Sequence, residues 1–298
     1  MSRHQGRTYV VTGAESDIGE LTAALLEDEG ARVLRCGAVD DLDVRADLVG
    51  DLGRDMLVSE VGRLAPSGID GLVLIAEGRA ATAEAVHVDY FGMLAALAGL
   101  RPLLRLRPAP RVVVVSSAVT LTDGDADVIT ACLRGDEEAA HTAAEHAVAA
   151  GRGGMLYRSA KIALNRWVRQ SATADEWAGT GVVVNVVAPG VVEEGEGAQG
   201  ASRDTARTRM LNAALPQPLG FPGPSRAVAA AISWMVSEEN SFMAGQIVFV
   251  DGGADAALRA DRPYLQGVRY GPLSLGRMLF WGVRSKVGVP LRRARRGA

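Results

Sequence analysis

Short runs of apolar, mostly β-branched residues alternate with helical stretches along this chain, and this alternation limits the possible fold more than any other feature. The runs are nearly all apolar, as in strands that are buried on both faces of a parallel sheet. Strand then helix, repeated, predicts an α/β fold with a doubly wound parallel sheet of the Rossmann type and right-handed crossovers. The expected strands are residues 8–11, 31–35, 71–76, 111–116, 182–187 and 246–250.

The composition is that of a globular chain with its own core. The 298 residues are 48% hydrophobic and 22% charged, and no apolar run approaches the ~18 residues of a membrane span. The two cysteines, Cys36 and Cys132, cannot build a disulfide framework. The first residues also lack the basic-then-apolar order of a signal peptide. We therefore expect a cytoplasmic protein.

Three segments depart from the strand and helix rhythm. Residues 120–154 form an insertion that is rich in Ala, Glu, Asp and His, and we expect one or two helices there. Residues 190–224 are rich in Gly, Pro, Arg and Thr, which predicts a lid-like segment beside a site. The sheet pattern stops at Gly253. We therefore expect one domain over 1–253 and an appendage over 254–298.

Charge is distributed unevenly between these two parts. The net charge is −3, but residues 254–298 carry +8 and residues 1–253 carry −11. An acidic body predicts no nucleic-acid partner. In residues 273–296 bulky apolar residues are interleaved with arginines, so this segment either packs on its own or a sister subunit, or contacts anionic lipid or an acidic partner.

A glycine turn joins the first expected strand to the first helix. Gly13 and Gly19 frame the stretch Thr12-Gly13-Ala14-Glu15-Ser16-Asp17-Ile18-Gly19. A turn of this kind lets a dinucleotide pyrophosphate approach the helix N-terminus. Two glycines six apart are a weak signal, but their place at a strand-to-helix junction favours a nucleotide site.

Tyr157 and Lys161 are four residues apart at the start of an apolar helix, so both side chains lie on one helix face. A phenol becomes a useful acid-base group near pH 7 only when a neighbouring cation favours the phenolate. Lys161 supplies that cation. Only two of the 32 basic residues are lysines, which raises the question of why arginine does not serve here.

Further motifs follow one another along residues 7–253. With the two already described, they are the Gly13/Gly19 turn, Asp47 after the second strand, 70–74, 88–92, Ser116-Ser117 at a strand end, Tyr157/Lys161, Asn185 to Pro189-Gly190, and 245–253. In their order and spacing these motifs resemble those of the short-chain dehydrogenase/reductase family. The long insertion is similar to that of the bacterial 3α-hydroxysteroid dehydrogenase/carbonyl reductase subgroup.

The resemblance implies a catalytic set and a cofactor site. Tyr157 would exchange a proton with the substrate oxygen, Lys161 would lower the pKa of Tyr157 and bind the nicotinamide ribose, and Ser117 would hydrogen-bond the substrate oxygen. If the alignment with the family motif is shifted by one residue, Ser116 takes the role of Ser117. Asp89 occupies the position of the family's active-site asparagine. The implied cofactor-binding residues are Gly13, Ser16, Asp17, Ile18, Gly19, Asp47, Leu48, Ala76, Tyr157, Lys161, Pro189, Gly190 and Val192.

Several positions depart from the family pattern, and most of the departures add negative charge around an anionic cofactor. Asp17 replaces a glycine of the phosphate turn, Asp89 the active-site asparagine, and Glu77 and Glu194 two further uncharged positions. A carboxylate 4 Å from a phosphate charge costs about 1 kcal/mol in water and about 4 kcal/mol at an effective dielectric of 20. Cofactor binding is thus expected to be weakened, though not necessarily lost.

Two functional hypotheses follow. The favoured one is an NAD(P)-dependent alcohol dehydrogenase/carbonyl reductase acting on a bulky secondary alcohol or ketone, because Tyr157, Lys161 and Ser117 are all present. The alternative is a catalytically impaired, regulatory binding protein.

The sequence says less about the choice between NAD and NADP and about the oligomeric state than about the catalytic residues. Gly37 stands where the family has an acid that selects NAD. Asp40 or Asp41 could replace that acid, which slightly favours NAD over NADP. The family also implies a homodimer or homotetramer. No metal site is expected, because His141 and His146 do not have the spacing of metal ligands.

Overall fold

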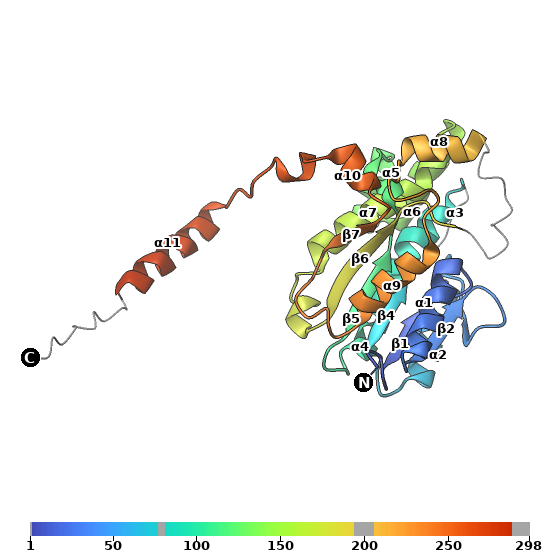
Figure 1. Ribbon diagram of the computed structural model, residues 1–298, viewed down its shortest axis with the longest axis horizontal. Coiled ribbons are helices and arrows are strands. Elements are labelled where there is room, and N and C mark those ends of the chain that lie inside the picture. Colours follow the sequence, from blue (N-terminus) through green and yellow to red (C-terminus); the bar gives the residue numbers. More distant parts are fainter. Residues whose placement is uncertain (1, 77–80, 194–205, 288–298) are drawn as a thin grey trace, which may run out of the picture. The chain divides into compact units, whose positions relative to one another are not determined.

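The computed structural model describes residues 2–76, 81–193 and 206–287, and divides into two units (Figure 1). The larger unit covers 1–258 and holds the sheet, whereas the smaller covers 259–298. The expected boundary after Gly253 lies five residues before the division between these two units. The Asp251 carboxylate accepts hydrogen bonds from the backbone N–H groups of Gly253 and Asp255 at the start of helix α10 (Ala254–Arg259). The last strand therefore leads directly into α10.

Strands and helices alternate through the larger unit. The strands are β1 (Thr8–Val11), β2 (Arg32–Gly37), β3 (Val44–Arg45), β4 (Gly71–Leu74), β5 (Arg111–Val115), β6 (Val183–Pro189) and β7 (Ile247–Val250). The helices are α1 (Asp17–Asp28), α2 (Asp51–Leu64), α3 (Glu84–Val86), α4 (Met93–Leu104), α5 (Ala126–Arg134), α6 (Glu137–Ala149), α7 (Leu156–Ser171), α8 (Ala206–Ala214) and α9 (Ser225–Val236). Short turns are the π-helical η1 (His87–Gly92) and the 3₁₀ turns η2 (Ala118–Leu121), η3 (Gly153–Met155) and η4 (Ala178–Thr180). The smaller unit adds η6 (Arg262–Tyr264) and α11 (Pro272–Val287).

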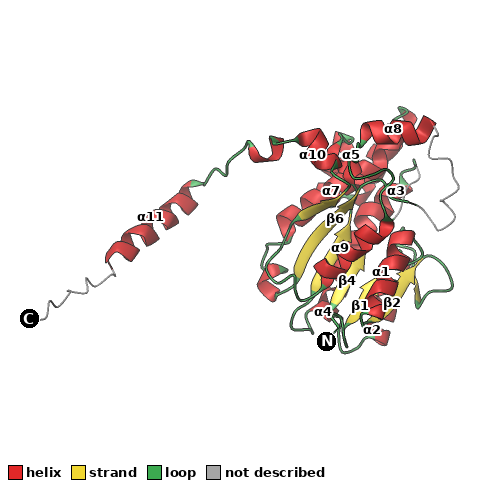
Figure 2. Ribbon diagram, in the orientation of Figure 1, coloured by secondary structure: helices red, strands yellow, loops and turns green. Residues whose placement is uncertain are grey.

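The described strands form one parallel sheet in the order β3-β2-β1-β4-β5-β6-β7 (Figure 2). This confirms the predicted doubly wound α/β fold. The chain runs outward from β1 to β3 and then returns to β4 on the other side of β1, which opens a crevice at the carboxyl edge between β1 and β4. The sequence pattern missed β3 because it has only two residues.

Successive strand residues point to opposite faces, and each face has its own core. Val112 and Val114 pack with residues of α2, α4 and α7, whereas Val113 and Val115 pack with residues of α1 and α9. Helices α1 and α9 lie together on one face (Figure 1). Burial on both faces explains the continuous apolar runs.

The insertion folds as two helices that pack against each other, α5 and α6, joined at Gly135, which has the positive φ of a helix C-cap (72°). Helix α5 packs against α7 as well as α6. Buried alanines make the close approach possible: Ala140, Ala144 and Ala147 lie in the same core as α7. The insertion therefore covers part of the helix that bears Tyr157 and Lys161.

A buried network at the amino edge of the sheet links the chain start to α9. Arg7 Nε donates to Tyr9 Oη (2.8 Å), so the hydroxyl proton of Tyr9 goes to His4 Nδ1 (2.7 Å). His4 Nε2 then donates to Ser233 Oγ (3.0 Å). Burial and the nearby Arg3 and Arg7 lower the pKa of His4 from 6.5 to about 4. The imidazole is thus neutral in the folded protein at neutral pH.

This network predicts a pH-dependent stability. Between about pH 6.5 and 4 the unfolded chain protonates His4 while the folded chain does not, so the free energy of unfolding falls as the pH falls through this window. From pH 7.5 to 5 the loss is about 2 kcal/mol. We expect His4→Asn to lack this part of the fall, measured by urea unfolding at both pH values. An equal fall in variant and parent would contradict the assignment.

Candidate active site

The glycine turn is held to the end of β4 by Thr12. Thr12 Oγ1 donates to Ile75 O (2.8 Å) and accepts from Ile75 N (2.9 Å). Gly13 has a φ of +57°, and a Cβ there would lie 2.8 Å from Ile75 O, so only glycine fits. Ser16 is the N-cap of α1 and accepts from Gly19 N (3.2 Å). The helix start thus faces the crevice with a close backbone approach, as a phosphate site requires.

A cavity of about 430 Å³ lies beside this turn at the carboxyl edge of the sheet. None of its described lining residues is basic. Of the predicted cofactor-binding residues, it brings together Gly13, Ser16, Asp47, Leu48 and Ala76. The other lining residues are Thr12, Glu15, Cys36, Gly37, Ala38, Ala46, Leu57, Ile75 and Val88. Tyr157 and Ser117 are not among the lining residues, so the cavity corresponds to the end of the site away from the expected chemistry.

Glu15 was not among the predicted site residues, yet its carboxylate lies over the end of β2. Glu15 Oε1 accepts from Ala38 N (3.0 Å), and a Cβ on Gly37 would collide with the same carboxylate. Asp40 and Asp41 are exposed and do not line the cavity, and Asp40 pairs with Arg45 (2.6 Å). Sequence spacing could not show that Glu15 reaches across to the next strand.

Arg54 on α2 connects the insertion to the wall of the cavity. Arg54 donates to Leu48 O and Val49 O (3.0 Å each) and to both oxygens of Glu137 on α6 (2.7 and 3.0 Å). Glu137 Oε1 also contacts His87 Nδ1 on η1 (2.6 Å). The insertion, the cavity wall and the π-helical turn are therefore joined by one buried guanidinium, a link the sequence does not reveal.

Lys161 is completely buried, and its ammonium joins α7 to both neighbouring strand ends. Nζ donates to Ala76 O (3.1 Å) after β4 and to Val115 O (3.3 Å) at the end of β5. Nζ also forms an ion pair with Asp89 Oδ1 (2.9 Å), and Asp89 is itself fully buried. Nζ further donates to Met93 Sδ on α4 (3.6 Å), so an ammonium with three N–H donors already has four acceptors around it. The expected contact of Lys161 with a nicotinamide ribose would thus require one of them to be displaced.

The π-helical turn η1 carries Asp89 to this position. Gly92 at its end allows the turn to approach the cavity wall, since a Cβ there would lie 2.5 Å from Leu48 O. Wider π turns are frequent at functional sites because they reorient a side chain within a helix. Asp89, in place of the family asparagine, gives Lys161 a full counter-charge instead of an amide.

Tyr157 lies on α7 and Ser117 at the start of η2, and a side-chain hydrogen bond joins these two regions. Tyr157 is half-buried in the first turn of α7, and Lys161 Nζ is 5.6 Å from its ring centroid, so the pair shares a helix face as predicted. Ser117 is the half-buried N-cap of η2. Arg158 Nη1 donates to Thr122 Oγ1 (3.2 Å), which joins α7 to the turn after Ser117. Ser116 is buried, and its hydroxyl has no hydrogen-bond partner among the described residues.

The backbone after β6 is fixed by Gln217. Its Nε2 donates to Val191 O (3.0 Å), and its Oε1 accepts from Val191 N. Val192 pairs with Gly223 in an isolated bridge, so the two ends of the 190–224 segment are paired to each other. A Cβ on Gly190 would collide with Gln217, which explains the glycine that follows Pro189. Glu77 and Glu194 lie outside the described residues.

Known proteins share the sequence pattern of this chain. The family model described as enoyl-(acyl carrier protein) reductase matches residues 12–255. The 3α-hydroxysteroid dehydrogenase/carbonyl reductase of Comamonas testosteroni is 31% identical over 84% of this chain and 97% of its own length. The chain belongs to the short-chain dehydrogenase/reductase family. The resemblance stated from the sequence is confirmed, and the protein is an NAD(P)-dependent oxidoreductase.

Solved structures show the same fold. The 3α-hydroxysteroid dehydrogenase of Pseudomonas sp. B-0831, complexed with NADH, has a TM-score of 0.76 at 34% identity and covers 85% of this chain and 98% of its own. The Pseudomonas aeruginosa RhlG/NADP active-site complex has a TM-score of 0.65 at 23% identity, with 85% and 99% covered. D-threitol dehydrogenase of Mycolicibacterium smegmatis is 28% identical over 84% of this chain and 94% of its own.

The buried pair predicts a specific stability pattern. Lys161→Met should lower the free energy of unfolding by about 3 to 5 kcal/mol, because it leaves the Asp89 carboxylate buried without its counter-charge. The double variant Lys161→Met/Asp89→Leu should recover most of this loss, since no uncompensated charge remains. Urea unfolding measures both, with Lys286→Met as the control for loss of a lysine. Additive losses in the double variant would contradict the pairing.

Proposed function

We propose that this protein interconverts a bulky secondary alcohol and its ketone, with Ser117, Tyr157, Lys161 and Asp89 as the reacting centre. The observation that carries the proposal is the pairing of Tyr157 and Lys161 on one face of α7, beside a glycine turn that is shaped for a dinucleotide. The bulky substrate is supported by the hydroxysteroid dehydrogenases among its relatives, two of which are at least 31% identical to this chain.

The cofactor class fits the residues at the cavity. Gly13 provides the close backbone approach, Ser16 caps the helix start, and Asp47 and Leu48 line the space beside them. When bound, the nicotinamide cofactor supplies or accepts the hydride. The other residues proposed to hold it are Asp17, Ile18, Gly19, Ala76, Tyr157, Lys161, Pro189, Gly190 and Val192.

The chain's own residues handle the proton and the orientation of the substrate. Tyr157 Oη gives a proton to the carbonyl oxygen in reduction and takes it back in oxidation. Ser117 Oγ hydrogen-bonds the same oxygen. Lys161 favours the phenolate of Tyr157 by its positive charge, and Asp89 holds Lys161 in place while offsetting part of that charge. The acid at position 89 therefore weakens the effect of Lys161 on Tyr157.

The catalytic role of Tyr157 has a direct test. Tyr157→Phe should lower kcat for a 3-ketosteroid by a factor of about 10² to 10⁴, because it removes the group that transfers the proton. NADH should still bind, with a loss of affinity much smaller than the loss of kcat, since the ring of residue 157 and the other cofactor-binding residues remain. Tyr264→Phe, at an exposed tyrosine of the smaller unit, is the matched control. Full activity of Tyr157→Phe would contradict the proposal.

A second candidate function is a binding protein without turnover. It is favoured by the internal contacts of Lys161, which occupy the donors that a nicotinamide ribose would use. NADH and NADPH titration combined with a ketone panel separates the two. Binding without turnover on any ketone supports the second candidate, and turnover supports the first.

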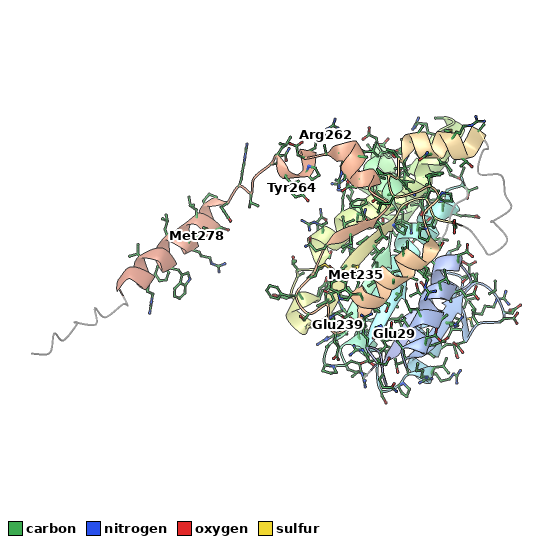
Figure 3. All side chains as sticks on the ribbon, viewed as in Figure 1. Glu29, Met235, Glu239, Arg262, Tyr264 and Met278 are labelled. Atoms are coloured by element: carbon green, nitrogen blue, oxygen red, sulfur yellow. The ribbon has the colours of Figure 1, made fainter. Side chains whose placement is uncertain are left out.

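The smaller unit is proposed to contact an anionic membrane surface from a cytoplasmic location. Figure 3 shows the side chains of α11, Met278 among them, projecting from the helix. None of the described helices is long and apolar enough to cross a bilayer. Residues 262–298 contain basic residues and no acid. Basic residues without acids, together with exposed bulky apolar side chains on one helix, are typical of interfacial segments. Bulky apolar side chains are 50–88% exposed at Leu273, Leu275, Met278, Leu279, Phe280, Trp281 and Val283.

Vesicle binding tests this surface. The full chain should co-sediment with vesicles that contain phosphatidylglycerol and not with pure phosphatidylcholine. Phe280→Ser/Trp281→Ser should lose at least about 90% of the pelleted protein, because two large apolar anchors are removed. Phe242→Ser, at an exposed aromatic of the larger unit, should pellet like the parent. Equal pelleting of both variants would contradict membrane contact and favour an acidic protein or sister subunit as the partner.

We also propose a homodimer or homotetramer, as the family implies. Because α5 packs on α7, the surface of the catalytic helix is partly covered, and the subunit contact would use another face.

A further inference from the structure

The carboxylate at the end of β2 that lines the cavity belongs to Glu15 of the glycine turn, and not to a residue of β2 itself. The proposed function does not explain this arrangement. Gly37 ends β2 and has no side chain to offer. Glu15 fills that space instead: its Oε1 accepts from Ala38 N (3.0 Å), and a Cβ on Gly37 would collide with its carboxylate. The glycine at 37 and the acid at 15 are therefore sterically linked.

We propose that Glu15 selects the non-phosphorylated dinucleotide, NAD, over NADP. The inference rests on the proposed function, because it assumes that the cavity takes the adenosine half of the cofactor. A carboxylate at the end of the second strand of such a fold accepts hydrogen bonds from the ribose 2′-hydroxyl. Glu15 presents that chemical group at the same place from a different element.

The surrounding charges favour the same choice. A 2′-phosphate carries about −1.5 to −2 charge at pH 7 and needs cationic partners. None of the described lining residues is basic, and Asp47 adds a second acid. The nearest arginines along the chain are engaged, since Arg35 pairs with Glu27 (2.7 Å) and Arg45 with Asp40 (2.6 Å).

The other acids near this strand end have different roles. The Asp40 side chain is 79% exposed and ion-paired. Asp43 Oδ2 accepts from Arg35 N (2.8 Å) in the loop before β3. Asp47 Oδ1 accepts from Val49 N (3.0 Å). Glu15 is thus the acid that lies on the terminal residues of β2 and also lines the cavity.

The test measures binding by calorimetry with two pairs of probes. NADH and NADPH report on the whole cofactor, whereas 5′-AMP and adenosine 2′,5′-bisphosphate report on the adenosine half without the contacts of Lys161. The parent should bind the member of each pair that lacks the 2′-phosphate at least about tenfold more tightly, which corresponds to 1.4 kcal/mol. Glu15→Gln should reduce this ratio about tenfold, mainly by tightening the 2′-phosphorylated member.

Two further variants separate charge from position. Glu20→Gln removes an exposed acid of the same type from the first turn of α1 and should leave the ratio unchanged. Glu15→Ser/Gly37→Asp moves the carboxylate to β2 and removes the collision with Glu15, so that only the end of the Leu42 side chain, 2.7 Å from the added Cβ, has to shift. This variant should restore the preference of the parent. Gly37 has an ordinary negative φ, which an aspartate tolerates.

Each outcome bears on the inference. An unchanged ratio in Glu15→Gln, with both dinucleotides bound, would overturn the role of Glu15 and leave the proposed function standing. Discrimination between the two adenosine fragments that depends on Glu15, without binding of either dinucleotide, would support the role of Glu15 and contradict the proposed interconversion of alcohol and ketone. If neither fragment nor dinucleotide binds at millimolar concentration, both are overturned.

Discussion

A buried ammonium holds the carboxyl edge of this sheet together. Lys161 Nζ reaches from α7 to the backbone after β4, to the end of β5 and to Asp89 on the π-helical turn. A charge in such a place is costly unless it is paired and hydrogen-bonded, so each of these elements must be in position for the others to be stable. Arginine does not serve here, because its planar fork cannot direct donors from one atom to the four acceptors that converge on Lys161 Nζ.

This constraint also affects the chemistry. The residues that make Lys161 stable in the core are the residues that reduce its effect on Tyr157 and that compete with a nicotinamide ribose for its donors. The proposed adenosine half of the site has no such conflict, since its turn, cavity and acid are already in place. In the function proposed here, the cofactor would meet a preformed adenosine half and a nicotinamide half in which internal contacts must be exchanged on binding.

Most strands of the sheet and the pairing of Tyr157 with Lys161 could be predicted from local sequence patterns. The apolar runs predicted six strands because burial on both faces leaves a clear signal, and the spacing of Tyr157 and Lys161 fixed their shared face. Contacts between distant segments could not be predicted. Glu15 reaches β2 only because Gly37 makes room, and Arg54 meets Glu137 across 83 residues. The two-residue β3 is too short for any periodicity, and the partner of Asp89 follows from the π-helical turn, which no sequence pattern indicated.

The chain contains only two lysines, Lys161 and Lys286, which makes its central interaction directly observable. Selective ¹⁵N labelling of lysine side chains should give one ammonium signal that is protected from exchange with water and belongs to Lys161, since Lys161→Met removes it. We expect this signal to persist at neutral pH and to shift when NADH is added. Rapid exchange of both ammonium groups, or a Lys161 signal that NADH leaves unchanged, would contradict the account.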